Sequence, residues 1–154
     1  MPLQPRSPTS ISTVVIDTNV VLDWLVFRNP GCVPFVQALA GGELRWLATA
    51  AMREELAHVL ARAVAAAWKA DHEAVWSAWD RHATVVPAVV ASGAMSRLRC
   101  TDAEDQKFID LALGHPARWL LSRDRAVLKL ARRSREFGVE IVTPERWTQL
   151  QLAP

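Results

Sequence analysis

Short apolar segments alternate with helix-like segments along most of the chain. Runs of β-branched and other apolar residues predict buried strands at 14–16, 44–48, 84–86, 118–121 and 140–142. The longer segments between them carry helix-capping residues at their starts and glycine or proline at their ends. Strands that alternate with helices are typical of parallel sheets covered on both faces. We therefore expect an α/β fold, a three-layer α/β/α sandwich around a mostly parallel five-stranded sheet.

The predicted helices span residues 19–27, 34–39, 49–68, 71–82, 101–114 and 125–135, with a last one that starts at 143–144. Thr101 and Glu104 form a capping box at the start of one helix, and Thr143 precedes a first-turn proline in the last. The first ten residues contain three prolines and two serines, which predicts a disordered tail over residues 1–12. Since no repeat or linker interrupts the rest, we expect one domain over residues 13–150.

Composition narrows the class of protein. The 154 residues are 51% hydrophobic and 22% charged, with a net charge of +2, which is typical of a globular domain. No run of 18 apolar residues lacks charges, so we expect no membrane span. Cys32 and Cys100 form no framework of disulfides, which favours a reducing, cytoplasmic location.

Two aspartates follow predicted strands. Asp17 comes directly after 14–16, and Asp124 comes three residues after Leu121. Ligands of open α/β sheets bind outside the carboxyl ends of the strands, so both aspartates are candidate site residues. Each could instead cap the helix that follows it.

A third aspartate lies on the inward face of a predicted helix. Asp105 shares the spacing i, i+3, i+4, i+7 with Phe108, Ile109 and Ala112. Burying a carboxylate there is costly unless it pairs with an arginine or binds a cation. Asp102 lies one turn earlier on nearly the same face, although a capping role is favoured for it.

Two adjacent glutamates in the helix at 49–68 differ in direction. The buried stripe of this helix consists of four apolar residues, Met52, Leu56, Val59 and Ala63. At about 100° per residue, Glu54 points away from this stripe and Glu55 lies on its edge. Glu55 is therefore the candidate for a site beside the core, with an exposed salt bridge as the alternative.

Four carboxylates are thus expected to converge at one end of the sheet: Asp17, Glu55, Asp105 and Asp124. Bare, they would repel one another and hold protons, whereas Mg²⁺ or Mn²⁺ would take them as oxygen ligands. Metal held by carboxylates activates water and stabilises charge on a phosphoryl group. No glycine-rich phosphate loop or zinc-type histidine spacing competes with this interpretation.

Basic residues are concentrated from Arg118 to Arg135, where seven basic residues and one acidic residue give 7 − 1 = +6. This balance favours an anionic partner, with a solvated helix face as the alternative. The candidate contacts for such a partner are Arg123, Arg125, Lys129, Arg132 and Arg133.

Several motifs, in order, resemble those of PIN-domain nucleases. Val-Val-Ile-Asp-Thr-Asn-Val at 14–20 is similar to the opening strand of that family, and Glu-Leu-Ala-His-Val-Leu at 55–60 to its second-acid helix. Asp-Ala-Glu-Asp-Gln-Lys-Phe at 102–108 resembles the Asp-Pro-Asp-Asp-x-x-Phe segment of a branch of VapC-like toxins. Ser-Arg-Asp at 122–124 stands where that branch has Thr-Gly-Asp-x-Asp, and Ile-Val-Thr-Pro at 141–144 resembles its closing strand and last helix. The resemblance covers about residues 13–150.

The resemblance implies a Mg²⁺- or Mn²⁺-dependent endoribonuclease, with Asp17, Glu55, Asp105 and Asp124 as catalytic metal ligands. The expected supporting residues are Thr18, Asn19, Asp102 and Ser122. In such a ribonuclease the basic residues named above are expected to hold the RNA backbone: Arg123, Arg125, Lys129, Arg132 and Arg133. It also implies a toxin that is inhibited by a small antitoxin protein and forms a homodimer. Two departures from the pattern, Ala126 for an aspartate and Arg123 for a glycine, keep two alternatives open. One is an RNA- or DNA-processing PIN nuclease without an antitoxin, and the other is a nuclease-dead module that binds nucleic acid.

Overall fold

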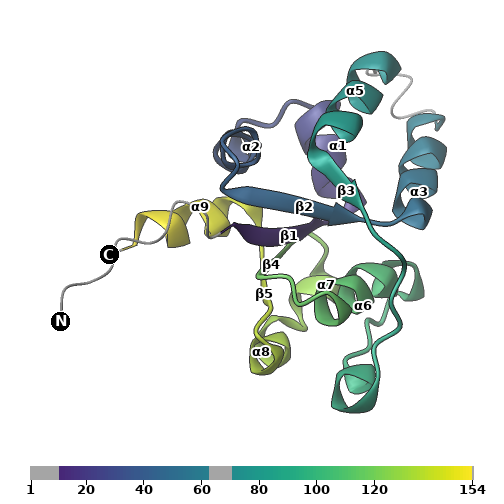
Figure 1. The fold of residues 1–154 in the computed structure, drawn as a ribbon, viewed down its shortest axis with the longest axis vertical. Coiled ribbons are helices and arrows are strands. Elements are labelled where there is room, and N and C mark those ends of the chain that lie inside the picture. Colours follow the sequence, from purple (N-terminus) through teal and green to yellow (C-terminus); the bar gives the residue numbers. More distant parts are fainter. Residues whose placement is uncertain (1–10, 63–70, 154) are drawn as a thin grey trace.

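A single parallel sheet forms the centre of the molecule. The computed structural model describes residues 11–62 and 71–153 (Figure 1). Its strands are β1 (Ser12–Ile16), β2 (Leu44–Ala48), β3 (Ala83–Val85), β4 (Trp119–Leu121) and β5 (Glu140–Val142). They lie in the order β3-β2-β1-β4-β5, and every neighbouring pair is parallel. The predicted five-stranded α/β sandwich is confirmed.

Helices cover both faces of this sheet (Figure 1). On one face lie α1 (Thr18–Leu25), α2 (Val33–Ala40), α3 (Ala50–Leu60) and α5 (His72–His82). On the other lie α6 (Gln106–Gly114), α7 (Arg125–Leu128) and α8 (Ala131–Ser134), and α9 (Pro144–Leu152) follows β5. Short 3₁₀ helices are η1 (Pro30–Cys32), η2 (Gly93–Arg97), η3 (Ala103–Asp105) and η4 (Arg135–Phe137). Among the described residues, none of these helices has the length and apolar character needed to cross a membrane.

The two central strands are buried on both faces. Val14, Val15, Leu120 and Leu121 have no exposed surface, as expected for a parallel sheet between two helical layers. Large aromatic side chains fill the layer beneath α1 and α5, where the Trp46 ring meets its neighbours edge to face. This continuous core gives the ends of β1 and β4 a rigid support.

Strand register decides which polar residues meet. Ile16 of β1 lies opposite Leu121 of β4, and the Asp17 amide donates to the Leu121 carbonyl at 3.0 Å. The next residues along the two strands, Asp17 and Ser122, are therefore neighbours at the carboxyl edge of the sheet. This is the edge at which ligands bind in open α/β folds.

Three predicted helix boundaries differ from the structure. Thr49 caps α3 through its hydroxyl, but the helix ends at Leu60, and the predicted continuation over 63–68 lies outside the described residues. The predicted helix at 125–135 is divided into α7, α8 and η4, and this division lets both short helices pack against β5. The capping box at Thr101 is wrong, because Asp102 is the cap: its Oδ1 accepts from the Glu104 amide at 3.0 Å. The cap thus moves by one residue, and because the 3₁₀ turn η3 follows it, α6 itself begins only at Gln106.

Candidate metal centre

Asp17 lies at the end of β1 with 2% of its surface exposed. Its Oδ1 accepts from the Asn19 amide at 3.2 Å and caps α1, while Oδ2 accepts from the Ser122 hydroxyl at 2.8 Å. Burial raises the pKa of Asp17, these two hydrogen bonds lower it, and the charges of Asp124 and Glu55 raise it again. Asp17 therefore caps a helix and faces the other acids at the same time.

Asp124 belongs to the loop that leaves β4. Its amide donates to the Ser122 Oγ at 3.0 Å, and its Oδ1 accepts from the Ala126 amide at 2.7 Å. The second bond caps α7. Because Ser122 bonds both Asp17 and Asp124, one buried hydroxyl fixes the two acids that follow neighbouring strands.

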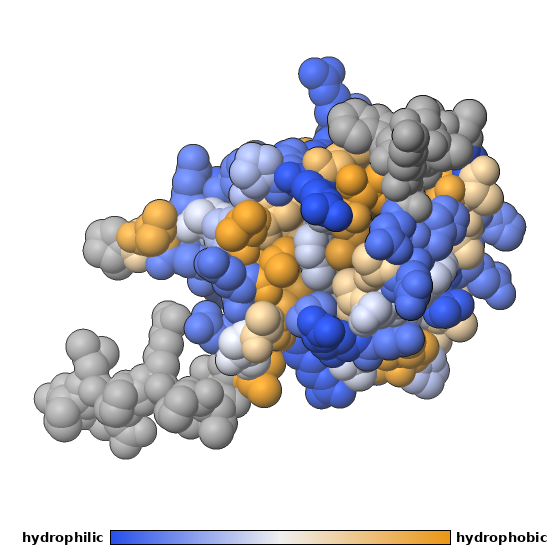
Figure 2. All heavy atoms as spheres, turned by 90° about the horizontal axis from the view of Figure 1, so that it is seen from above, coloured by the Kyte–Doolittle hydropathy of each residue, from blue (hydrophilic) through white to orange (hydrophobic). Residues whose placement is uncertain are grey.

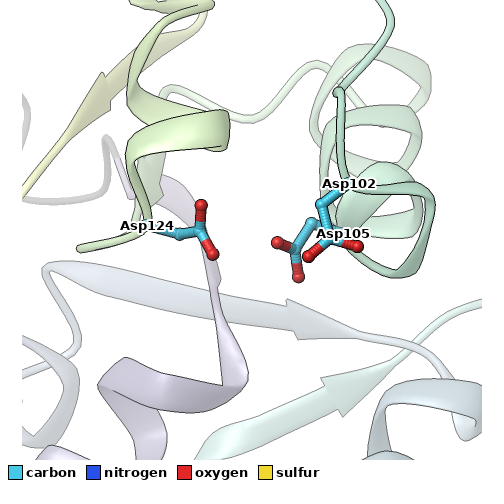
Figure 3. Close-up of side chains that lie close together, drawn as sticks. All are labelled: Asp102, Asp105 and Asp124. Carbon is cyan, nitrogen blue, oxygen red and sulfur yellow. The ribbon is translucent and has the colours of Figure 1, made fainter.

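Three aspartates form the tightest acidic cluster among the residues the structure describes. Carboxylate oxygens of Asp102, Asp105 and Asp124 all lie within 4.8 Å of one another. Figure 3 shows Asp124 facing the other two from the opposite side, across the gap between α7 and the turn before α6. Asp102 thus caps a turn and also belongs to the cluster, so its capping role does not exclude a role in the site.

Asp105 is the least compensated carboxylate of this cluster. Its Oδ2 is buried and has no hydrogen-bond partner. Burial raises the pKa of Asp105 to about 7, with further contributions from the charges of Asp17, Asp124 and Asp102. Asp105 is half-buried and ends η3 directly before α6, so it is the N-cap residue of that helix and not, as the spacing with Phe108 and Ile109 predicts, a member of its apolar face.

Glu55 and Glu54 occupy different environments. Glu54 is exposed and Glu55 is half-buried, although both line the same open cavity. The Thr18 hydroxyl donates to Glu55 Oε2, and the Lys107 ammonium lies 2.8 Å from Oε1. Both oxygens of Glu55 therefore have partners, which separates Glu55 from the three clustered aspartates.

One open cavity of about 650 Å³ brings the predicted acids together. Of the predicted site residues, it is lined by Asp17, Thr18, Asn19, Glu55, Asp102, Asp105 and Asp124. Ser122 is fully buried behind Asp17 and does not line it. The tight cluster differs from the expected quartet, because Asp102 joins it while Asp17 and Glu55 flank it.

Three basic side chains of the cavity were not singled out from the sequence: His58, Arg62 and Lys107. His58 and Arg62 come three and seven residues after Glu55, so helical spacing could have placed them on the same face. Lys107 belongs to the site through its contact with Glu55, which is 52 residues away in the sequence. A local sequence pattern cannot predict such a contact.

None of the five basic residues expected to bind RNA lines this cavity. Arg123 forms ion pairs at 2.6 Å with Asp23 of α1 and with Glu145 of α9. The other four are exposed on α7, α8 and the turn between them: Arg125, Lys129, Arg132 and Arg133. The structure thus separates Arg123, which ties two helices to the loop after β4, from the exposed basic residues.

The donor atoms of the cluster suit a hard divalent cation. Three carboxylates within 4.8 Å offer only oxygen ligands, and the buried Oδ2 of Asp105 has no other partner. Mg²⁺ and Mn²⁺ prefer such ligands and keep waters in their remaining positions. A cation here would offset both the burial and the neighbouring negative charges that raise the pKa of Asp105.

The comparisons with known proteins agree with this geometry. A parallel α/β sheet with acids at its carboxyl edge is the architecture expected of a PIN-like domain. The sequence model of the PIN domain family matches residues 13–126, which is most of the chain, and the protein belongs to this family. PIN domains are generally nucleases and typically bind divalent metal ions. No curated protein matches the sequence significantly.

Proposed function

We propose that the protein is a metal-dependent endoribonuclease that hydrolyses RNA phosphodiester bonds at the carboxyl edge of its sheet. The observation that carries this proposal is the uncompensated carboxylate of Asp105, which faces Asp124 and Asp102 in an open cavity. Without a cation, the ionised carboxylates of this cluster would repel one another at neutral pH and destabilise the fold. Binding of Mg²⁺ or Mn²⁺ by the cluster would remove this repulsion.

The residues of the cavity have distinct roles in this proposal. Asp102, Asp105 and Asp124 would hold the ion, and Asp17 would complete the negative site from the end of β1. The chemistry that such an ion supplies when bound is activation of water and stabilisation of charge on the phosphoryl group. Ser122 holds Asp17 in place through its hydroxyl hydrogen bond. Thr18 holds Glu55 in the same way from the start of α1.

Substrate binding would extend beyond the cavity. Four exposed basic residues belong to the positively charged segment 118–135: Arg125, Lys129, Arg132 and Arg133. If they contact phosphates, RNA affinity should fall with salt by about one unit of log–log slope for each contact. Replacing Arg132 and Arg133 together by alanine should make the salt dependence of RNA affinity less steep. An unchanged slope would mean that these two residues face solvent and do not contact phosphates.

The same proposal includes that this protein is the toxin of a toxin–antitoxin pair. The motif at 102–108 resembles that of a branch of VapC-like toxins, which supports a small antitoxin as partner, a homodimer as assembly and the cytoplasm as location. Figure 2 shows several groups of hydrophobic residues between hydrophilic ones on this face of the molecule. Co-expression with a small neighbouring gene product and sizing at micromolar concentration test the partner and the dimer.

Incubation of the purified protein with mixed RNA and single-stranded DNA tests the activity itself. We expect cleavage of RNA with Mg²⁺ or Mn²⁺ and none in excess chelator. The Asp105→Asn variant, purified in the same way, controls for contaminating nucleases. Cleavage that persists in chelator, or equally in the variant, contradicts the proposal, and preferential cleavage of DNA favours a processing nuclease.

A second candidate, a nuclease-dead binding module, rests on Ala126. This residue packs against the core and donates its amide to Asp124, so no carboxylate enters the site from this position. Calorimetry separates the two functions, because a binding module predicts RNA binding without any divalent metal binding.

A further inference from the structure

Glu55 differs from the other carboxylates of the cavity in having both oxygens engaged. The Lys107 Nζ lies 2.8 Å from Oε1, and the Thr18 hydroxyl donates to Oε2. Asp105, in the same cavity, has a buried oxygen without a partner. One carboxylate is therefore already neutralised by the protein, and another is not.

Lys107 is held in place on more than one side. Its ammonium also donates to the Glu104 carbonyl at 2.6 Å and lies 5.1 Å from the centre of the Phe108 ring. The side chains of Lys107 and Glu55 are 27% and 24% exposed, so their ion pair is shielded from water more than a surface pair is. The pair joins α6 on one face of the sheet to α3 on the other (Figure 1).

This contact divides the cavity into two places for positive charge. At Glu55 the place is taken by an ammonium group, and a divalent ion could bind there only after displacing it. At Asp102, Asp105 and Asp124 the carboxylates face one another with no protein cation among them in the described residues. Lys107 is also the only basic residue between 101 and 114, so no neighbour in this segment could replace it.

We propose that Lys107 acts as a built-in second cation of the site, so that the cavity binds one divalent ion at the aspartates and Glu55 is reserved for the lysine. This inference rests on the proposed metal-dependent function. It assigns Glu55 a different role from a metal ligand: Glu55 positions the Lys107 ammonium inside the cavity, where that charge faces an incoming phosphate.

The test counts the ions that the full-length protein binds, by equilibrium dialysis with Mn²⁺ and by calorimetry. We expect one ion in the wild type. The Lys107→Met variant keeps the length of the side chain and removes its charge, and we expect it to bind a second, weaker ion. Lys107→Arg keeps the charge and should return the count to one. The double variant Lys107→Met/Glu55→Gln should also bind one ion, because the second site needs the Glu55 carboxylate.

Lys129→Met is the matched control for loss of a lysine, since Lys129 is exposed and outside the cavity, and its ion count should stay at one. Circular dichroism establishes that each variant is folded. Two ions in the wild type overturn the inference without requiring any variant, and so does a single ion in folded Lys107→Met. The count is independent of turnover: a wild type that binds one ion but cleaves no RNA contradicts the proposed function alone.

Discussion

The Ser122 hydroxyl donates a 2.8 Å hydrogen bond to Asp17 Oδ2, joining two residues that are 105 positions apart in the sequence. The same oxygen accepts from the Asp124 amide at 3.0 Å. The first contact follows from the parallel register of β1 and β4, which places the ends of these strands side by side, and the second is local to the loop after β4. A fully buried serine therefore holds the two strand-end acids in one arrangement.

Replacing Ser122 by alanine should weaken metal binding. Asp17 loses the hydrogen bond that lowers its pKa, so its carboxylate holds a proton more tightly. Loss of a residue that orients a metal site typically costs about 10–100-fold in affinity. Calorimetry with Mn²⁺ measures this change. Ser134→Ala is the control, because Ser134 is equally buried but bonds only the backbone of α8 and Val139. Equal metal affinity in both variants would contradict the role of Ser122.

The Asp105→Asn variant should be more stable than the wild type in metal-free buffer. The substitution removes a charge that is disfavoured by burial and by three neighbouring aspartates. A gain of 1 kcal/mol corresponds to a rise of about 2–4 °C in Tm for a chain of this size. Addition of Mn²⁺ should raise Tm of the wild type and leave the variant unchanged. A lower Tm of the variant without metal would mean that Asp105 is not strained by its neighbours.

Metal affinity should rise with pH up to about neutrality. The pKa of Asp105 is raised to about 7 in the metal-free protein, so an ion must displace a proton below that pH. Each unit below the pKa costs up to about tenfold in affinity for one such proton. The same shift predicts that metal-free stability falls as pH rises from about 4 to 7, because the unfolded chain ionises this group first. Mn²⁺ titrations between pH 5.5 and 8.5 test the first statement, and the loss of this dependence in Asp105→Asn identifies the group.

Glu55→Gln and Glu54→Gln should differ sharply. The first removes the carboxylate that holds Lys107, and we expect cleavage to fall by orders of magnitude with a stability change of no more than about 1 kcal/mol. The second changes an exposed side chain and should alter stability by less than about 0.5 kcal/mol. Single-turnover cleavage assays and thermal unfolding measure the two effects. Equal loss of cleavage in both variants would contradict the orientation of α3.

Arg123→Ala should destabilise the fold. The guanidinium pairs with Asp23 and Glu145, and its loss leaves two carboxylates without their partner. We expect a loss of about 1.5–3 kcal/mol, the range for hydrogen bonds to charged groups. Arg125→Ala is the matched control, because Arg125 is exposed and should affect RNA affinity more than stability. Denaturant unfolding together with RNA binding at several salt concentrations separates the two arginines.

Local sequence patterns were sufficient to predict the helical and sheet layers of this protein and most of the acidic residues of its candidate site. The apolar runs at 14–16 and 119–121 are sufficient to predict the buried parts of β1 and β4, because strand segments buried on both faces are nearly continuous in apolar residues. Helical spacing predicts that Glu55 flanks the core and that Glu54 faces solvent, and Glu55 is indeed half-buried and Glu54 exposed, although Glu54 also lines the cavity. These features depend on residues within a few positions of one another, so they can be recognised without the fold.

Only the tertiary structure decided which charged groups meet. The grouping of Asp102 with Asp105 and Asp124, the contact of Lys107 with Glu55 and the ion pairs of Arg123 each join segments that are distant in the sequence. A local pattern predicts the direction of a side chain from its own helix or strand, but not which residue of another element lies opposite. Strand order and register determine that at the carboxyl edge of the sheet, because they set which loops lie side by side.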